Sequence, residues 1–165
     1  MKKPVFVSAQ DAAAMTGDGK TVATIGMTLV SASETILKAI EKRFLETGSP
    51  NQLTLVHSCG QSDRDRGIQH FSHDGMLKCI IGGHWGLQPR MMKMIAENKM
   101  LAYCLPQGQF AQLYRSMAGG EPGKITKVGL GTFIDPRLGG GKMNEIPQDL
   151  SLIHISEPTR RSYIS

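Results

Sequence analysis

The 165-residue sequence has few of the residues on which several protein classes depend. Its three cysteines, Cys59, Cys79 and Cys104, are odd in number and widely spaced without a C-x-x-C pair, which argues against a disulfide framework or a zinc ribbon. Aromatic residues make up only 5% of the chain. The formal net charge is +5, but the basic residues are scattered. With neither stacking platforms nor a basic stripe, no nucleic-acid partner is expected.

Long apolar runs are missing as well. No stretch reaches the roughly eighteen apolar residues of a membrane-spanning helix, so no membrane partner is expected. The N-terminal Met1-Lys2-Lys3 leads directly into a short strand-like run, and we expect no signal peptide and a cytoplasmic location. Apolar residues still make up 40% of the chain, which is enough for the core of one ordinary domain.

Short apolar runs alternate with helix-like segments along the chain. Predicted strands cover residues 21–26, 53–57, 77–81 and 100–104. Predicted helices follow Ser8 and Ser31, lie near 89–97 and cover 109–117. Capping-box spacing marks the first two helix starts, and Gly48 with Pro50 marks the end of the second helix. This alternation predicts an α/β fold with an open, mostly parallel sheet flanked by helices.

Glycine-containing segments follow three of the predicted strands. Gly26 follows the first strand, Gly82 and Gly83 follow the third, and Gly108 belongs to the Pro-Gln-Gly turn after the fourth. In an open parallel sheet, ligands bind beyond the carboxyl ends of the strands. We therefore expect a binding site at that edge of the sheet.

The segment GGHWG after the third strand holds the only tryptophan of the chain. A functional interpretation places His84 and Trp85 at the entrance of a site, where the glycines let a ligand or partner approach closely. A structural interpretation is a tight turn in which Trp85 plugs the sheet edge and His84 makes an ordinary hydrogen bond. Taken alone, the segment favours the structural interpretation, because the sequence names no partner for a general acid at His84.

Gln107 lies between Pro106 and Gly108 at a predicted junction of strand and helix. Its amide could donate a hydrogen bond to a carboxylate or thioester oxygen there, and the helix N-terminus would add a positive dipole. An ordinary turn at a helix N-terminus explains the same pattern. The spacing alone does not separate these two interpretations.

Charged and metal-ligating side chains give weaker signals. The run DRDR at residues 63–66 is typical of a solvated loop whose charges pair with one another. His70 with His73, and His57 with Cys59, are spaced so that each pair could share a metal ion. Neither pair completes a four-ligand pattern, so no metal site is expected.

A second glycine-dense region covers residues 129–141 and includes Gly131 and Thr132. Such a region predicts a loop that bends sharply or approaches another chain or a ligand closely, or else a flexible surface hairpin. A Walker-type phosphate site is not predicted, because the G-x-x-x-x-G-K-[ST] pattern does not occur.

Three stretches, taken together, resemble a known family: DRDRGIQHFSHDGMLKCIIGGHWGLQPRM, AYCLPQGQFAQLYRSMAGGEPG and GLGTFIDPRLGGGKMNE. In this order they resemble the N-terminal half of the family I CoA-transferases, in particular the single-chain acetate or propionate CoA-transferases, also called acyl-CoA:acetate/3-ketoacid CoA-transferases. The resemblance implies a CoA-transferase-like fold, related to that of sugar-phosphate isomerases and deaminases, in an N-terminal domain over residues 1–150. Residues 151–165 show no periodicity, and we expect them to be a non-native or disordered tail.

The resemblance also implies an activity. Such enzymes move CoA between a short-chain acyl-CoA and a carboxylate such as acetate or propionate, by a ping-pong route through a glutamyl-CoA thioester. Two halves or two subunits build the site, and the glutamate lies in the second, so no catalytic residue is assigned to this chain. The chain alone is expected to be inactive. The expected complete enzyme is a homo-oligomer that uses coenzyme A as a substrate and binds no cofactor.

Individual residues are carried over from the family by position. Gln107 matches an amide that stabilises the oxyanion or binds the substrate carboxylate, and Gly108 belongs to the same turn. Further residues match segments near the active site or the domain interface: Gly26, Gly82, Gly83, His84, Trp85, Gly131 and Thr132. The sequence departs from the family at 27–30, where Met-Thr-Leu-Val replaces glycines, and this puts substrate choice or activity in doubt. The alternatives are a non-catalytic acyl-CoA- or carboxylate-binding module and a sugar-phosphate isomerase-like enzyme.

Overall fold

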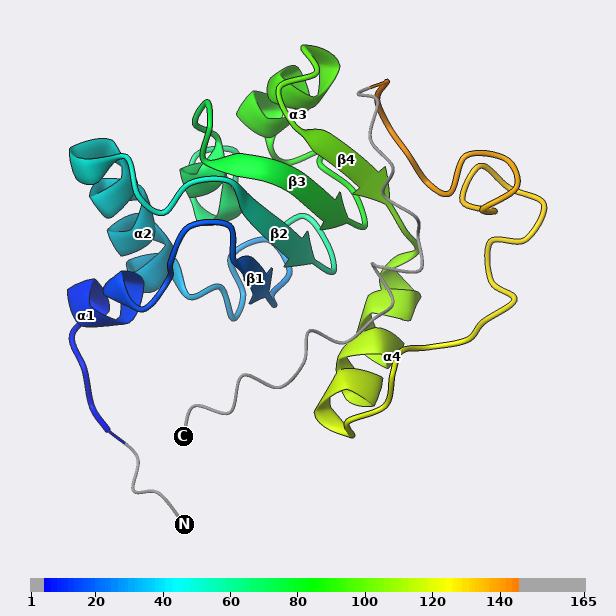
Figure 1. Cartoon of the computed structure of the whole chain (residues 1–165), viewed down its shortest axis with the longest axis horizontal. Coiled ribbons are helices and arrows are strands. Elements are labelled where there is room, and N and C mark those ends of the chain that lie inside the picture. The colour runs from blue at the N-terminus through cyan, green and yellow to red at the C-terminus, as the bar shows by residue number, and fades with distance from the viewer. Residues whose placement is uncertain (1–4, 146–165) are drawn as a thin grey trace.

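The computed structural model describes residues 5–145, so the interpretation of residues 151–165 as a tail lies outside the described residues. The elements in chain order are α1 (Ala9–Ala14), β1 (Thr21–Thr24), α2 (Glu34–Thr47), β2 (Leu53–His57), the 3-10 helix η1 (Gly67–Phe71), β3 (Leu77–Gly82), α3 (Pro89–Ala96), β4 (Leu101–Cys104) and α4 (Gln107–Ala118). Within the described part, the strands form a four-stranded parallel sheet in the order β1-β2-β3-β4 (Figure 1). The predicted α/β fold with an open parallel sheet is confirmed.

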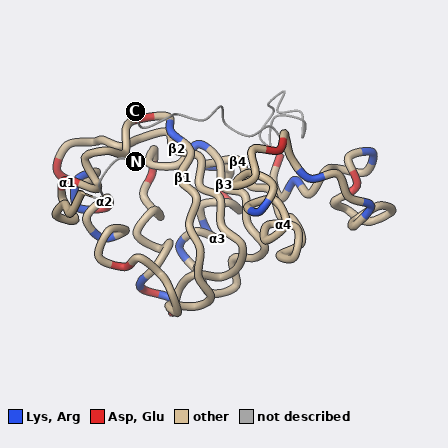
Figure 2. The backbone as a smooth tube through the Cα atoms, turned by 90° about the horizontal axis from the view of Figure 1, so that it is seen from below, with Lys and Arg blue, Asp and Glu red and all other residues tan. Residues whose placement is uncertain are grey.

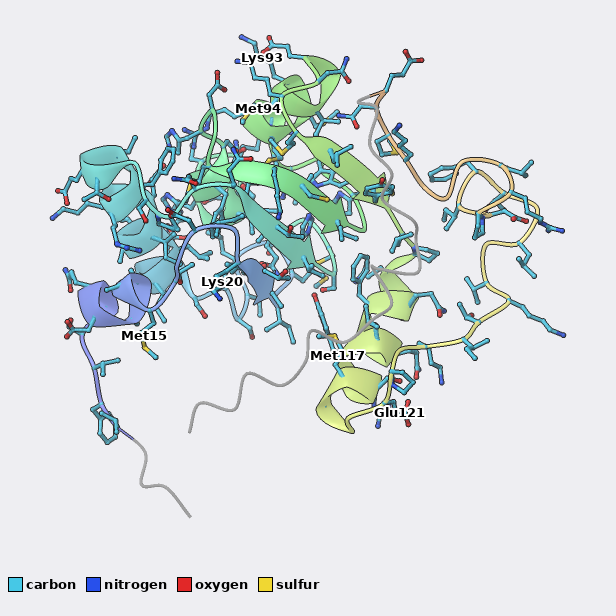
Figure 3. The ribbon with its side chains drawn as sticks, in the orientation of Figure 1. Met15, Lys20, Lys93, Met94, Met117 and Glu121 are labelled. Atoms are coloured by element: carbon cyan, nitrogen blue, oxygen red, sulfur yellow. The ribbon has the colours of Figure 1, made fainter. Side chains whose placement is uncertain are left out.

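The two faces of the sheet are covered by different elements because side chains alternate along each strand. On one face, Leu55 and Ile80 belong to a core shared with α1, α2, η1 and α3. On the other face, Ile81 and Tyr103 pack with Phe110 of α4. Figure 3 shows Lys93 on the outer side of α3, pointing away from the sheet. Each helix thus buries the face that it turns toward the sheet.

Helix starts and ends follow local signals to different degrees. The Ser8 hydroxyl accepts a hydrogen bond from the Asp11 amide at 3.1 Å, which confirms the predicted cap of α1. The predicted capping box at Ser31 is wrong: α2 begins at Glu34 after Ser33, and Ser31 lies in the preceding turn with a φ of 62°. Gly48 ends α2 in a left-handed conformation with a φ of 72°, as predicted.

A return segment, Gly141–Asn144, lies along the outer edge of β4 after a long excursion of the chain beyond α4 (Figure 1). The Cys104 amide donates to the Gly141 carbonyl at 2.7 Å, and the Met143 amide donates to the Ala102 carbonyl at 2.9 Å. The Asn144 side chain donates to the backbone carbonyls of Met100 and Ile95, and it accepts from the Ala102 amide. The return segment therefore satisfies backbone groups that an edge strand would leave unpaired.

Charged residues are spread along the described chain, and blue and red positions occur on elements on several sides of the molecule (Figure 2). This distribution agrees with the scattered basic residues of the sequence. Across residues 5–145, none of the helices has the length and apolar character needed to cross a membrane.

Candidate functional site

The loops after the four strands meet at the carboxyl edge of the sheet, and hydrogen bonds join each loop to the next. Between the loops of β1 and β2, the Cys59 thiol donates to the Gly26 carbonyl at 2.9 Å. The Thr28 amide donates to the Gly60 carbonyl, also at 2.9 Å. The β1 loop, which contains the sequence departure at 27–30, is thus held at its tip by the β2 loop.

The loops of β2 and β3 are joined by two histidines that each pack on a glycine of the other strand's segment. His57 and Gly82 are neighbours in the sheet register, and a Cβ added to Gly82 would lie 2.1 Å from His57 Nε2. In the reciprocal contact, a Cβ added to Gly60 would lie 2.6 Å from His84 Cε1. The Gly60 amide also donates to His84 Nε2 at 3.2 Å. At Gly82 and at Gly60, an imidazole ring occupies the space that a side chain would take. Only glycine therefore fits at these two positions.

The loops of β3 and β4 meet at Gly83. The Cys104 thiol donates to the Gly83 carbonyl at 3.2 Å. A Cβ added to Gly83 would lie 2.4 Å from the Ser58 carbonyl oxygen and 3.5 Å from Gln107 Cβ. The second glycine of GGHWG therefore lets the chain pass between the β2 loop and the start of α4, and Gln107 lies directly beside it.

Gln107 is the first residue of α4, which begins two residues earlier than the predicted start at Gln109. Pro106 precedes the helix in an extended conformation and makes no side-chain cap. Gln107 and Gly108 are exposed in the first turn, where backbone N–H groups have no partner within the helix. This end of α4 can therefore offer an amide side chain, backbone donors and the positive end of a helix dipole to an anionic or carbonyl oxygen.

Burial shifts the pKa values of three titratable groups at this edge, His57, Cys59 and Cys104, toward their neutral forms. Burial lowers the pKa of His57 to about 4, although the hydrogen bond to the Cys59 carbonyl opposes this shift and His84 adds to it. Burial raises the pKa of the Cys59 thiol and of the Cys104 thiol above the ordinary value. Because thiolates are the nucleophilic form of cysteine, these thiols act here as hydrogen-bond donors rather than as nucleophiles.

Trp85 lies in the core and not at an exposed entrance. Its side chain is 6% exposed and belongs to the cluster that α1, α2, η1 and α3 cover. The indole packs against the His57 ring with centroids 6.2 Å apart in an edge-on arrangement. His84, the next residue along the chain, is exposed and makes its contacts with the backbone of Gly60 and Gly86. His84 and Trp85, which the functional interpretation of GGHWG placed together at an entrance, therefore have different surroundings.

Gly131 and Thr132 make their hydrogen bonds within the glycine-dense region. The Gly131 amide donates to the Asp135 carboxylate at 2.8 Å, and the Thr132 hydroxyl donates to the Gly129 carbonyl at 2.7 Å. The Arg137 side chain donates to Asp135 and lowers the pKa of that buried carboxyl far below its usual range. Sequence reasoning missed Asp135, although an aspartate that bonds to the backbone of its own turn is a common turn signal.

The DRDR run and the His70–His73 pair have hydrogen-bond partners elsewhere in the structure or within the run itself. Arg66 donates to Asp63 at 2.6 and 2.8 Å, which confirms that charges in the DRDR run pair with each other. His70 and His73, considered above as a pair that could share a metal, instead bond to carboxylates of α2. In the part of the chain described, no group of three or more His, Cys, Asp or Glu side chains is placed to hold a metal ion.

The fold and this edge define an open α/β domain in which glycine-containing loops surround an exposed helix N-terminus. Residues 6–157 match the family described as Coenzyme A transferase. The chain belongs to this family.

Three relatives indicate how much of a family member the chain represents. It is 39% identical over 160 residues to the caffeate CoA-transferase of Acetobacterium woodii, covering 96% of this chain and 30% of that protein. It is 26% identical over 133 residues to the acetate CoA-transferase subunit alpha of Escherichia coli, covering 81% of this chain and 58% of the subunit. The crystal structure of the acyl-CoA transferase YdiF from E. coli O157:H7, a thioester complex with CoA, matches with 36% identity and a TM-score of 0.81 over 87% of this chain and 30% of YdiF. The chain thus spans about 30% of the length of the caffeate CoA-transferase and of YdiF.

Proposed function

We propose that this chain is the N-terminal part of a CoA-transferase that moves CoA between a short-chain acyl-CoA and a carboxylate such as acetate or propionate. The observation that supports the proposal most strongly is the match in fold and sequence to YdiF, a relative crystallised as a thioester complex with CoA. Coenzyme A is a substrate in this proposal and not a resident cofactor.

The proposed reaction is a ping-pong exchange. A glutamate carboxylate outside this chain accepts CoA as a thioester and releases the first carboxylate; a second carboxylate then takes the CoA and frees the glutamate. Negative charge develops on the acyl oxygen in each step. Amide donors that are fixed beforehand around such an oxygen stabilise the transition state. We assign this role to Gln107 at the start of α4, with Gly108 leaving the adjacent backbone open to the substrate.

The surroundings of three glutamates support the assignment of the nucleophile to another part of the protein. Glu34 is occupied by hydrogen bonds from His70 and from the Gly67 amide. Glu97 forms ion pairs with Lys93 and Lys99 at the end of α3. The Glu145 amide bonds to Asn98, before the start of β4 and therefore at the opposite end of that strand from Gln107.

The missing part of the site belongs, in this proposal, to the rest of a longer chain or to a partner subunit. Single-chain relatives are much longer than this chain, and one relative is by name a separate alpha subunit. The same domain therefore occurs in both arrangements within the family. Where the missing part belongs to the same, longer chain, we propose that the complete enzyme assembles as a homo-oligomer.

The test supplies the missing part from a relative. The chain is co-expressed with the part of YdiF that it does not match, and propionyl-CoA formed from acetyl-CoA and propionate is measured. We expect exchange by the combined protein and none by the chain alone. Gln107→Ala should lower the rate by about 10²- to 10³-fold, the usual effect of removing one oxyanion donor. Gln112→Ala, on an exposed position of the same helix, serves as the matched control.

Two results would contradict the proposal. Exchange by the purified chain alone would mean that the nucleophile lies within it. Saturable CoA binding by the combined protein without any turnover would favour a non-catalytic acyl-CoA-binding module instead.

A further inference from the structure

Four titratable side chains join α2 to the η1 region away from the carboxyl edge, and we call them the Glu–His network: Glu34, Glu41, His70 and His73. His70 lies between the two carboxylates, with Nε2 2.7 Å from Glu34 and Nδ1 2.5 Å from Glu41. The second oxygen of Glu41 lies 2.6 Å from His73 Nε2. Because His70 is buried and bonds to residues two helical turns apart, it fixes α2 against η1 in one register.

The Glu–His network contains three contacts between an imidazole nitrogen and a carboxylate oxygen. Burial by itself would raise the pKa of Glu41, but the hydrogen bonds from His73 and His70 lower it below the ordinary value. The bonds of the Glu41 carboxylate are thus charge-assisted, and such bonds are stronger than bonds between neutral groups.

One member of the network also reaches the β2 loop. The second oxygen of Glu34 accepts a hydrogen bond from the Gly67 amide at 2.9 Å. Gly67 has a φ of 71°, and a Cβ there would lie 2.0 Å from the Gln61 carbonyl oxygen. Gln61 directly follows Gly60, the residue that holds Thr28 at the carboxyl edge. Glu34 therefore contacts the far end of the same loop whose near end contributes to the candidate site.

The β2 loop holds the connection between β1 and α2 at two points. At the tip of the connection, the Thr28 amide donates to the Gly60 carbonyl. At its base, Glu34 opens α2 and holds Gly67. Thr28 has a φ of 52°, which is unfavourable for a β-branched residue and persists only when surrounding contacts enforce it. The connection is thus held at both ends by one loop, and its strained tip depends on both attachments.

We propose that Glu34 is a positioning residue: its carboxylate, oriented by His70, sets the β1–α2 turn against the β2 loop and so holds the Thr28–Gly60 contact at the site edge. Glu34 itself does not touch the edge and acts through Gly67 and the turn. The inference rests on the proposed function only in treating that edge as the substrate side.

Amide hydrogen exchange of the 15N-labelled 165-residue chain, measured by NMR, tests this inference without any CoA chemistry. The readout is the exchange rate of the Thr28 amide relative to that of Leu55, a buried residue of β2. Glu34→Gln should raise Thr28 exchange about tenfold or more over any change at Leu55, as expected for loss of a hydrogen bond to a charged group.

Two control variants separate positioning from general stabilisation. Glu41→Gln removes the carboxylate bonded to both histidines but leaves the bonds of Glu34 to His70 and Gly67, so any increase in exchange should be equal at Thr28 and Leu55. Glu46→Gln, on an exposed ion pair of the same helix with Lys42, should change neither amide. If Glu34→Gln does not fold, Glu34→Asp keeps the charge while shortening its reach to Gly67, and the same selective increase is expected. An equal change at both amides, or no change at Thr28, would overturn the proposal, whatever the outcome of the CoA-exchange assay.

Discussion

The packing of His57 on Gly82 predicts that a side chain at position 82 destabilises the protein. In Gly82→Ala, the new methyl group would lie 2.1 Å from His57 Nε2 and 2.4 Å from His57 Cε1. The ring cannot move freely, because it is fully buried and bonded through Nδ1 to the Cys59 carbonyl at 2.7 Å. The substitution therefore forces either a displaced ring and a broken hydrogen bond or a separation of β2 from β3.

The expected loss of stability combines two effects. Overpacking of a core costs about 1–3 kcal/mol, and leaving a buried polar group without its partner costs about 1–3 kcal/mol more. We expect Gly82→Ala to lower the free energy of unfolding by about 2–6 kcal/mol. With a urea dependence of about 2 kcal/mol per molar, typical of a small protein, the unfolding midpoint should fall by about 1–3 M.

Two further variants make this prediction specific to the contact. Gly108→Ala places its methyl group with no heavy atom within 4 Å, and alanine favours a helix by about 1 kcal/mol over glycine, so its midpoint should stay or rise. In a His57→Ala background the ring is gone, and Gly82→Ala should then cost less than about 1 kcal/mol. An unchanged midpoint for Gly82→Ala, or an equal cost in both backgrounds, would refute the packing argument.

Three other predictions concern different parts of the chain. The native pKa of Glu41 lies below its unfolded value, so the stability that Glu41→Gln removes should be present at pH 7 and disappear as the pH falls below about 4; a difference in urea midpoints that persists unchanged to pH 3 would contradict this. Asn144→Ala removes the bonds to Ala102, Ile95 and Met100 and should lower stability by about 1–3 kcal/mol, with faster amide exchange at Ala102; unchanged exchange there would count against the role of the return segment. Burial raises the pKa of Cys79 to about 11, so a thiol reagent at pH 8, followed by mass spectrometry, should label the half-buried Cys104 first, and the reverse order would be inconsistent with the structure.

Much of the sheet could be predicted because its strands are short apolar runs separated by turn residues. The predicted range 53–57 is identical to β2, and Gly82 adds one residue to the predicted third strand. The candidate edge could be predicted as well, since parallel strands bring their carboxyl ends together wherever glycines follow them. Helix starts were less predictable. Ser31 has capping-box spacing but adopts a positive φ, and α4 includes Gln107 because Pro106 can precede a helix without a side-chain cap.

The contacts that organise the site could not be predicted from local patterns. Glu41 and His70 are 29 residues apart, and Asn144 and Ile95 are 49 residues apart, so no sequence window contains both partners. The η1 helix was also missed, because it lies within a polar loop where a short 3-10 turn leaves no apolar period. The contacts of GGHWG could not be predicted from local patterns either. The roles of its glycines depend on His57 and Ser58, which only the fold brings beside them.

The return segment on β4 also protects this sheet against aggregation in a concentrated solution. A bare strand edge is a template on which other chains can add, and such additions lead to domain swapping and fibrils. Gly141 to Asn144 occupy that template on the β4 side, which leaves the four-residue β1 as the other outer strand of the described sheet. A piece of the chain cut before Gly141 would lose this protection. We therefore expect such a piece to aggregate at concentrations at which the longer chain stays dispersed.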